Sequence, residues 1–217
     1  GADLGEANLK RSCLIRAVLI DANLSGANLS GADLNSADLR NADLGGAKMR
    51  KVNLVHADLR DTGIGETTKI SDKWRLIWEI LNNGAEGRNL SNADLSGADL
   101  RYVDLSRIDL SGADLSGADL GEANLSAADL RNSNLSKTRL TGVNLKDAIV
   151  SGVNLEESQY EAASSPNSDF LGGLRGLSTV WFEEGKQSGL LMLRADLKDA
   201  GLRNLEREAT YAIQFLK

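Results

Sequence analysis

A five-residue repeat runs through most of the chain and constrains its fold more than any other feature. Stepping by five from Leu4 reaches an apolar residue every time as far as Ile64, and stepping by five from Leu90 does so as far as Tyr160. Two positions before most of these centres lies a small residue, usually Ala, and between the two lies Asp or Asn in most repeats. This period matches neither an α-helix, with about 3.6 residues per turn, nor a strand, with a period of about two.

Each repeat is predicted to be a short extended piece followed by a bend. The two less polar positions are two residues apart, so extended backbone places both side chains on one face. The other positions are rich in Gly, Ser, Asn and Asp, which favour turns through their φ tolerance and local hydrogen bonds. One such unit cannot bury its apolar side chains alone, and units of fixed period therefore stack into solenoids.

The tandem pattern Ala-(Asp/Asn)-Leu-X-X, seen as ANLSGADLNSADLRNADL over residues 27–44, resembles the pentapeptide-repeat family. The resemblance implies an all-β solenoid, a right-handed quadrilateral β-helix with four pentads per coil and about seven coils in this chain. The segments WRLIWEI (74–80) and GAEGRNL (84–90) are similar to cyanobacterial members, so a cyanobacterial source is expected. Stacked Leu flanked by stacked Ala would fill the core and leave little room for a ligand.

The extent of the repeat predicts how the chain is divided. Residues 1–160 should form the β-helix, interrupted at 65–89 by an insertion that contains a helix over 72–82. Ser71 suits the N-cap of this helix, and Gly84 suits its end. Residues 161–217 contain no regular pentads and favour helices, so we expect an α-helical C-terminal cap that covers the last coil.

Two apolar features interrupt the polar exterior and are candidate partner-binding sites. The inserted helix carries Trp74 and Trp78 on a wide apolar stripe, and Trp is enriched at binding hot spots. Ile15, Val18 and Ile20 occupy outward positions that hold polar residues in other repeats. The alternatives are that the tryptophans pack on the rod, and that the aliphatic residues are covered by an upstream segment or by the chain itself.

Acidic residues are concentrated in the second repeat block. Residues 90–160 carry eleven acidic and six basic residues, in a chain with a net charge of −6. With coils of twenty residues, Asp94 would stack on Asp114 and Asp99 on Asp119, which makes these four a candidate acidic face. Some members of the family resemble duplex DNA and occupy the DNA site of gyrase, and the resemblance implies this activity as one alternative. This chain departs from those members in two ways: Arg residues are interspersed among the acidic residues, and the pentad centres are Leu rather than Phe. Direct nucleic-acid binding is not expected, because an acidic rod repels phosphate.

No catalytic, cofactor-binding or metal-binding constellation is predicted. Cys13 is the single Cys and His56 the single His, both at outward positions, so they form neither a Cys-based zinc site nor a nucleophile with its base. No apolar run is long enough to span a membrane. We therefore expect a non-enzymatic scaffold or protein-interaction module with an unidentified protein partner. A DNA-mimicking modulator of gyrase is the alternative.

The ends of the chain bear on its assembly and compartment. The sequence starts at Gly1 within a repeat and without Met, so an incomplete N-terminus is expected. A cytoplasmic location is favoured, and export stays open. A homodimer could use an N-terminal end without a cap, or the C-terminal helices with Trp181, Phe182, Tyr211 and Phe215.

Overall fold

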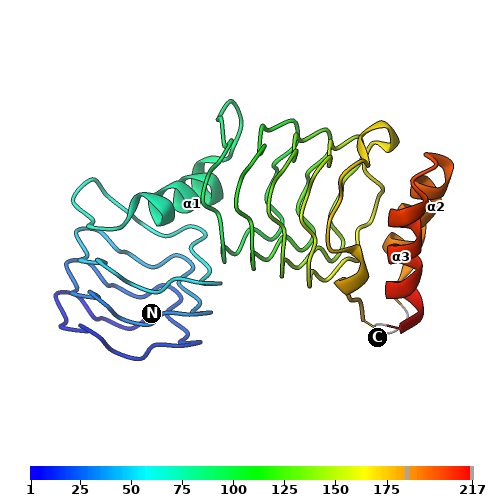
Figure 1. Cartoon of the computed structure of the whole chain (residues 1–217). Coiled ribbons are helices and arrows are strands. Elements are labelled where there is room, and N and C mark those ends of the chain that lie inside the picture. The colour runs from blue at the N-terminus through cyan, green and yellow to red at the C-terminus, as the bar shows by residue number, and fades with distance from the viewer. Residues whose placement is uncertain (184–185, 216–217) are drawn as a thin grey trace. The chain divides into compact units, whose positions relative to one another are not determined.

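The chain forms two compact units, Gly1–Gly84 and Ala85–Lys217, and each is described by itself. The computed structural model describes residues 1–183 and 186–215, with the backbone alone at Phe215. The division lies directly after helix α1 (Asp72–Asn83), which belongs to unit 1 (Figure 1). Both repeat blocks follow the same pattern, so the repeat alone predicts a domain boundary at residue 160.

Each unit is a stack of coils joined by single parallel β-bridges. The bridged residues lie twenty apart, so that Asn23 pairs with Asp3 in one neighbouring coil and with Asp43 in the other. Backbone hydrogen bonds flank each bridge: the Leu24 N–H donates to the Asp43 carbonyl at 2.8 Å, and the Asn23 N–H donates to the Ala2 carbonyl at 2.9 Å. Four pentads therefore complete one coil, and each pentad contributes one side and one corner.

The corner between two sides has left-handed backbone at its second residue. In one column this position is held by Glu6, Gly26 and Gly46, with φ of 56°, 67° and 69°. Glycine adopts this conformation without steric cost, whereas most other residues do so at some cost. The fixed place of turn-forming residues within the pentad follows from this requirement.

The pentad centres fill the interior of both units. Leu24 and Leu34 in unit 1 and Leu110 and Leu120 in unit 2 have no exposed surface. The small residue two positions earlier also faces inward, as at Ala27, because alternate side chains of extended backbone share a face. The Asp or Asn between them consequently faces outward.

The coils of unit 1 extend further than the pentad pattern predicts. Lys48 pairs with Lys69, which lies twenty-one residues later, so one extra residue shifts the phase without ending the coil. Thr68 takes the place of the inward Ala, and its buried hydroxyl donates to the Leu44 carbonyl at 2.8 Å. The predicted insertion at 65–89 was therefore too long, because a strict five-residue step cannot follow a one-residue shift.

Helix α1 has ends close to those predicted and is bound to the last coil of unit 1. Ser71 occupies the N-cap position, and the N–H of the C-cap residue Gly84 donates to the Ile80 carbonyl at 3.1 Å. Side chains of the helix donate to carbonyl oxygens of the coil: Trp78 Nε1 to Thr62 at 2.9 Å, Asn82 Nδ2 to Leu59 at 3.1 Å and the Arg75 guanidinium to Thr68 at 3.0 Å.

The coils of unit 2 continue past residue 160, where the pentads stop. Arg175 pairs with Asn154, and Trp181 pairs with Gln159. These pairs are separated by twenty-one and twenty-two residues, so the last coil is longer than a regular one. Its irregular spacing explains why the sequence pattern did not reveal it.

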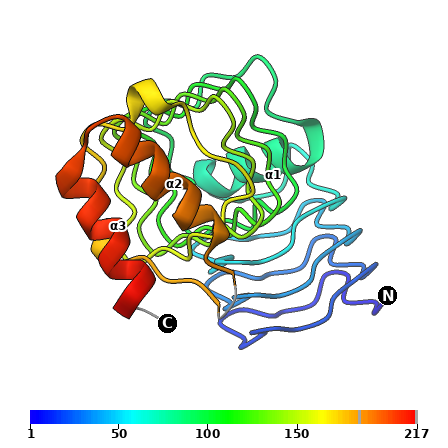
Figure 2. The same cartoon turned by 90° about the vertical axis from the view of Figure 1, so that its right-hand side faces the viewer.

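The C-terminal segment predicted as helical, 161–217, is only partly so. Its helices are the short 3₁₀ turns η1 (Ser168–Phe170) and η2 (Leu177–Thr179) and the α-helices α2 (Ser188–Asp199) and α3 (Arg203–Phe215). The prediction was wrong for the residues before α2, because backbone pairing with the preceding coil takes precedence over their weak helical pattern. Helices α2 and α3 lie side by side (Figures 1 and 2).

Helix α2 packs on the last coil of unit 2 (Figure 2). Its buried side carries Leu190, Leu193 and Leu197. Gly189 lies so close to the coil that a Cβ there would be 2.5 Å from the Ala162 carbonyl oxygen. That the helices act as a cap stays a prediction.

Candidate interaction surfaces

Outward Asp and Asn side chains form hydrogen-bonded ladders along the sides of the coils. In unit 2, Asn124 Nδ2 donates to Asp104 Oδ1 at 3.0 Å, and Asn144 Nδ2 donates to Asn124 Oδ1 at 3.0 Å. The Ser164 hydroxyl continues the ladder by donating to Asn144 at 2.8 Å. The bonds all point toward the N-terminal coil, where an ionised Asp, which only accepts, ends the ladder. The side chains of the ladder thus serve as hydrogen-bond partners for one another.

Beside some of the stacked Asp pairs lies an arginine. Arg101 donates to the two oxygens of Asp99 at 2.8 and 2.6 Å and lies 3.8 Å from Asp119. Arg139, one coil further, lies 3.7 Å from Asp119. Opposite charges thus alternate along this column, which offsets the repulsion between the stacked carboxylates.

The same arrangement in unit 1 lowers the pKa of two carboxyl groups. Hydrogen bonds from the Arg40 side chain lower the pKa of Asp38. Burial raises the pKa of Asp58, but hydrogen bonds from the side chain and backbone of Arg60 outweigh it, so the net pKa is lowered. In unit 2, the pKa values of Asp104 and Asp129 are lowered by hydrogen bonds from the Ser106 backbone and the Arg131 side chain.

Stability is expected to fall in acid because these carboxyl groups have folded-state pKa values below the unfolded value. Each contributes stability that is fully present above the unfolded pKa, 3.8 for Asp, and is lost as the pH falls through the lower folded pKa. The urea concentration at the midpoint of unfolding should therefore be constant near pH 7 and should decline below about pH 4. Arg60→Gln should flatten the part of this decline due to Asp58, whereas Lys146→Gln should not. A parent midpoint that does not change in acid would contradict this origin of stability.

The four residues of the candidate acidic face stack in the expected pairs, but on two sides of the coil. Asp94 pairs with Asp114 and Asp99 with Asp119, and the two pairs are one pentad apart. Asp94 is exposed, whereas Asp99 is 6% exposed and bound to Arg101. The negative charge of this region is therefore divided between two sides and partly neutralised.

The two tryptophans of α1 lie against protein rather than projecting into solvent. Trp74 is 7% exposed. Trp78 is half-buried, and its indole N–H is bonded to the Thr62 carbonyl. Partner binding through these rings stays a prediction, and their burial leaves little ring surface for a partner.

The aliphatic residues singled out in unit 1 follow one another along the outside of one coil. Ile15 lies at a corner and is 48% exposed, Val18 lies on the next side and is 75% exposed, and Ile20 lies at the following corner and is half-buried. These three residues are called the aliphatic strip. It presents apolar side chains where the next coil carries Asn35, Asp38 and Arg40.

The aromatic residues near the C-terminus are partly exposed. Trp181 is 43% and Tyr211 50% exposed, whereas Phe182 is buried. The side chain of Phe215 lies outside the described residues. Pairing of two chains through these helices or through the N-terminal coil stays a prediction.

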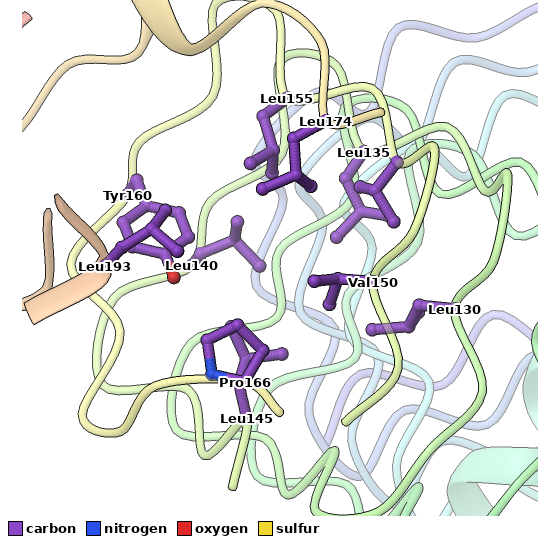
Figure 3. A pocket seen from close by; sticks show the side chains of 11 residues that line it. Leu130, Leu135, Leu140, Leu145, Val150, Leu155, Tyr160, Pro166, Leu174 and Leu193 are labelled. Atoms are coloured by element: carbon purple, nitrogen blue, oxygen red, sulfur yellow. The ribbon is translucent and has the colours of Figure 1, made fainter. Parts of the chain in front are cut away.

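A small apolar space lies inside the last coils of unit 2, and Leu193 of α2 is among the residues that line it (Figure 3). Its volume is about 20 Å³. It is lined by several leucine side chains and by Val150, Val153, Tyr160 and Pro166. Burial raises the pKa of the Tyr160 hydroxyl, and the negative charge of Asp196 adds to this effect. An apolar space of this size stays dry and is too small for an organic ligand.

Filling this space is expected to stabilise the protein. Val150 stands in a column whose other members are Leu90, Leu110 and Leu130, so Val150→Leu restores the residue that the column accommodates. The added methylene should raise the free energy of unfolding by about 0.5–1 kcal/mol, measured by urea denaturation. Val18→Leu, at an exposed position, serves as the control and should change little. A loss of stability in the Val150 variant would show that the lining is already tightly packed.

The described residues reveal no site for metal chemistry. Within them, no group of three or more His, Cys, Asp or Glu could hold a metal ion. Cys13 is an exposed free thiol, and His56 is exposed at a corner. In the same part of the chain, no helix has both the length and the apolar composition needed to cross a bilayer.

The pentads of both units match those of a known family. A family model of pentapeptide repeats matches residues 2–41, 27–62, 89–126 and 123–158, which together make up more than half of the chain. The chain belongs to the pentapeptide-repeat family. The family match, together with parallel bridges between residues twenty apart, confirms the predicted solenoid of four-pentad coils in its main point. The number of coils and the role of the C-terminal helices stay predictions for this pentapeptide-repeat protein.

Several solved structures are similar to this pentapeptide-repeat protein. HetL, a pentapeptide-repeat protein involved in heterocyst differentiation regulation in the cyanobacterium Nostoc sp. strain PCC 7120, is 28% identical; the match covers 84% of this chain and 79% of HetL, with a TM-score of 0.25. Rfr23 from the cyanobacterium Cyanothece 51142 is 24% identical over 76% of this chain and 88% of its own, with a TM-score of 0.25. QnrB1, a plasmid-mediated fluoroquinolone resistance protein, is 18% identical over 89% and 84%, with a TM-score of 0.21. A comparison with curated proteins gave no significant match.

One charged surface, on unit 1, was not predicted from the sequence. Unit 1 has a balanced total charge, which hides a side where basic residues gather. The signal was present as the basic pairs Lys10–Arg11 and Arg50–Lys51, which lie forty residues apart and therefore in the same columns.

Proposed function

We propose that this pentapeptide-repeat protein is a non-enzymatic scaffold that binds protein partners through the outer sides of its coils. The packed interior carries this proposal, because the pentad centres are buried and the apolar space inside the last coils of unit 2 has a volume of only about 20 Å³. Recognition then has to use side chains outside the coils. Many carboxylates there are engaged in ladders with their neighbours, which suits a rigid surface better than a reaction centre.

The aliphatic strip is the first candidate contact of this scaffold. Exposed aliphatic side chains gain free energy when a partner buries them, and Val18 and Ile15 are the most exposed of the three. The double variant Ile15→Asn, Val18→Asp places in this coil residue types that the next coil carries in the same columns, at Asn35 and Asp38. The variant should therefore fold.

The experiment is chemical cross-linking of purified protein in lysate of the source organism, followed by identification of the captured proteins. A partner bound by the parent should be lost in the strip variant and retained in Ser106→Asn, Asp109→Asn, which changes the equivalent pentad positions in unit 2. If the parent captures no protein reproducibly, the scaffold proposal fails. A partner retained by both variants would support a scaffold whose contact lies elsewhere.

Gyrase-directed DNA mimicry is the alternative that the family resemblance implies. The stacking of Asp94 on Asp114 favours it, whereas the arginine beside Asp99 and Asp119 reduces the available charge. A mimic should inhibit gyrase supercoiling, and Asp94→Asn with Asp114→Asn should weaken that inhibition. Parent protein without effect on supercoiling would reject this alternative.

A further inference from the structure

We propose that one side of unit 1 binds a short Asp- and Glu-rich segment of a partner protein, an inference that rests on the proposed function as a protein-binding scaffold. This side consists of the pentads centred on Leu9, Leu29, Met49 and Ile70, together with the corners that follow them. Its exposed cationic side chains are called the basic face: Lys10, Arg11, Lys48, Arg50, Lys51 and Lys69.

Coil stacking brings these distant residues together. Lys48 and Lys69 are bridged neighbours on the side itself. Arg50 and Lys51 lie at the corner two coils away from Lys10 and Arg11, a separation of roughly 10 Å at about 4.8 Å per coil. Two pairs of cations are thus held in line by the backbone and do not depend on side-chain contacts for their placement.

Small residues separate the two cationic pairs. The coil between them carries Ser30 and Gly31 at the corresponding corner. The Arg11 side chain lies over this coil, since its Cγ is 3.4 Å from the place that a Cβ on Gly31 would occupy. The corner between the two cationic pairs therefore carries no bulky side chain of its own, and the Arg11 side chain lies over it.

The basic face is not neutralised by the protein. Among the residues that the structure describes, none of its six side chains has an ion-pair partner, whereas Arg40 and Arg60 on another side of unit 1 are bound to Asp38 and Asp58. Asp72, at the start of α1, is the acidic residue in the register of this side and its corner. Six cations against one acid, in a chain of net charge −6, make this side electrostatically distinct.

An acidic polypeptide segment suits this side better than a nucleic acid. The four stacked pentads extend over roughly 14 Å, which is the length of an extended segment of about four residues. Their side and corner positions hold no aromatic side chain on which a base could stack. A long phosphate backbone would also continue onto the neighbouring sides, where Asp43 and Asp33 stand in the ladders.

The test measures binding of a fluorescein-labelled peptide of alternating Glu and Ser to the whole chain by fluorescence anisotropy. The parent should bind, with an affinity that falls as NaCl is raised, because exposed charge pairs are screened. The triple variant Lys48→Asp, Arg50→Glu, Lys51→Glu should bind at least about tenfold more weakly. It should fold, because Asp occupies the bridged position at Asp43 and Glu occupies the left-handed corner position at Glu6; circular dichroism checks this.

The matched control changes the net charge equally at exposed cations of unit 2: Lys146→Glu, Lys198→Glu, Arg203→Glu. Its affinity should stay within about twofold of the parent. Equal weakening in both triple variants, or no binding by the parent, would overturn the proposal. Tighter binding of a DNA duplex or of vesicles containing phosphatidylserine than of the peptide would also overturn it. A partner captured through the aliphatic strip while the peptide fails to bind would leave the scaffold function intact.

Discussion

Replacing Leu120 by Ala is expected to lower the free energy of unfolding by roughly 3 kcal/mol, within the range of about 2–5 kcal/mol for buried leucines. Leu120 has no exposed surface and stands in a column between Leu100 and Leu140, which are also fully buried. Backbone hydrogen bonds fix each coil to the next, as from the Leu120 N–H to the Arg139 carbonyl at 2.9 Å. The column therefore cannot collapse to fill the cavity, and the full cost should be observed.

Urea denaturation followed by far-ultraviolet circular dichroism measures this effect. Leu191→Ala is the matched control, because Leu191 is 42% exposed on α2 and its truncation should cost less than about 0.5 kcal/mol. Equal losses in the two variants would show that burial in the column does not determine stability. A small loss at Leu120 alone would mean that the coils adjust to fill the space.

Gly189→Val is expected to detach α2 from the last coil and to make unit 2 prone to aggregation. A Cβ at this position would lie 2.5 Å from the carbonyl oxygen and 2.7 Å from the nitrogen of Ala162, and backbone atoms cannot move aside as a flexible side chain could. Separation would expose Tyr160 and Leu193, which now line the small apolar space. Overpacking of this kind costs about 1–3 kcal/mol or more.

The measurement combines thermal unfolding with light scattering after concentration. Gly172→Val is the matched control, because a Cβ on Gly172 would meet nothing within 4 Å. A lower melting temperature and increased scattering in Gly189→Val alone would support the cap predicted for the C-terminal helices. Unchanged behaviour of both variants would indicate that the last coil is stable without α2.

The repeat made the architecture of this protein predictable to a large extent. Because every fifth residue from Leu4 and from Leu90 is apolar, the stacked coils, their buried columns and their outward Asp and Asn followed from local chemistry. Helix α1 was also predictable, since the periodicity around Trp74 and the glycine at Gly84 are local signals. The candidate interaction residues differ in their structural surroundings. The aliphatic strip is largely exposed, whereas Trp74 is buried.

The errors have a common physical origin in irregular coils. The one-residue shift before Thr68 and the long coil that pairs Trp181 with Gln159 preserve backbone pairing while breaking the five-residue step. A search for a strict five-residue period does not detect such coils. Their backbone is nevertheless held in place by hydrogen bonds to the preceding coil. The same argument explains why the pentad pattern ended the predicted β-helix at residue 160, although the coils continue beyond it.

The sequence by itself determined the local unit of this pentapeptide-repeat protein: an inward Leu, an inward small residue, an outward Asp or Asn and a left-handed corner. Each of these choices follows from side-chain polarity and φ preference within five residues. Only the tertiary structure decided which charges meet, because residues twenty apart become neighbours when coils stack. Stacking places Arg101 beside both Asp99 and Asp119. It also brings Lys10 and Arg11 near Arg50 and Lys51, and so forms a basic face on an acidic protein.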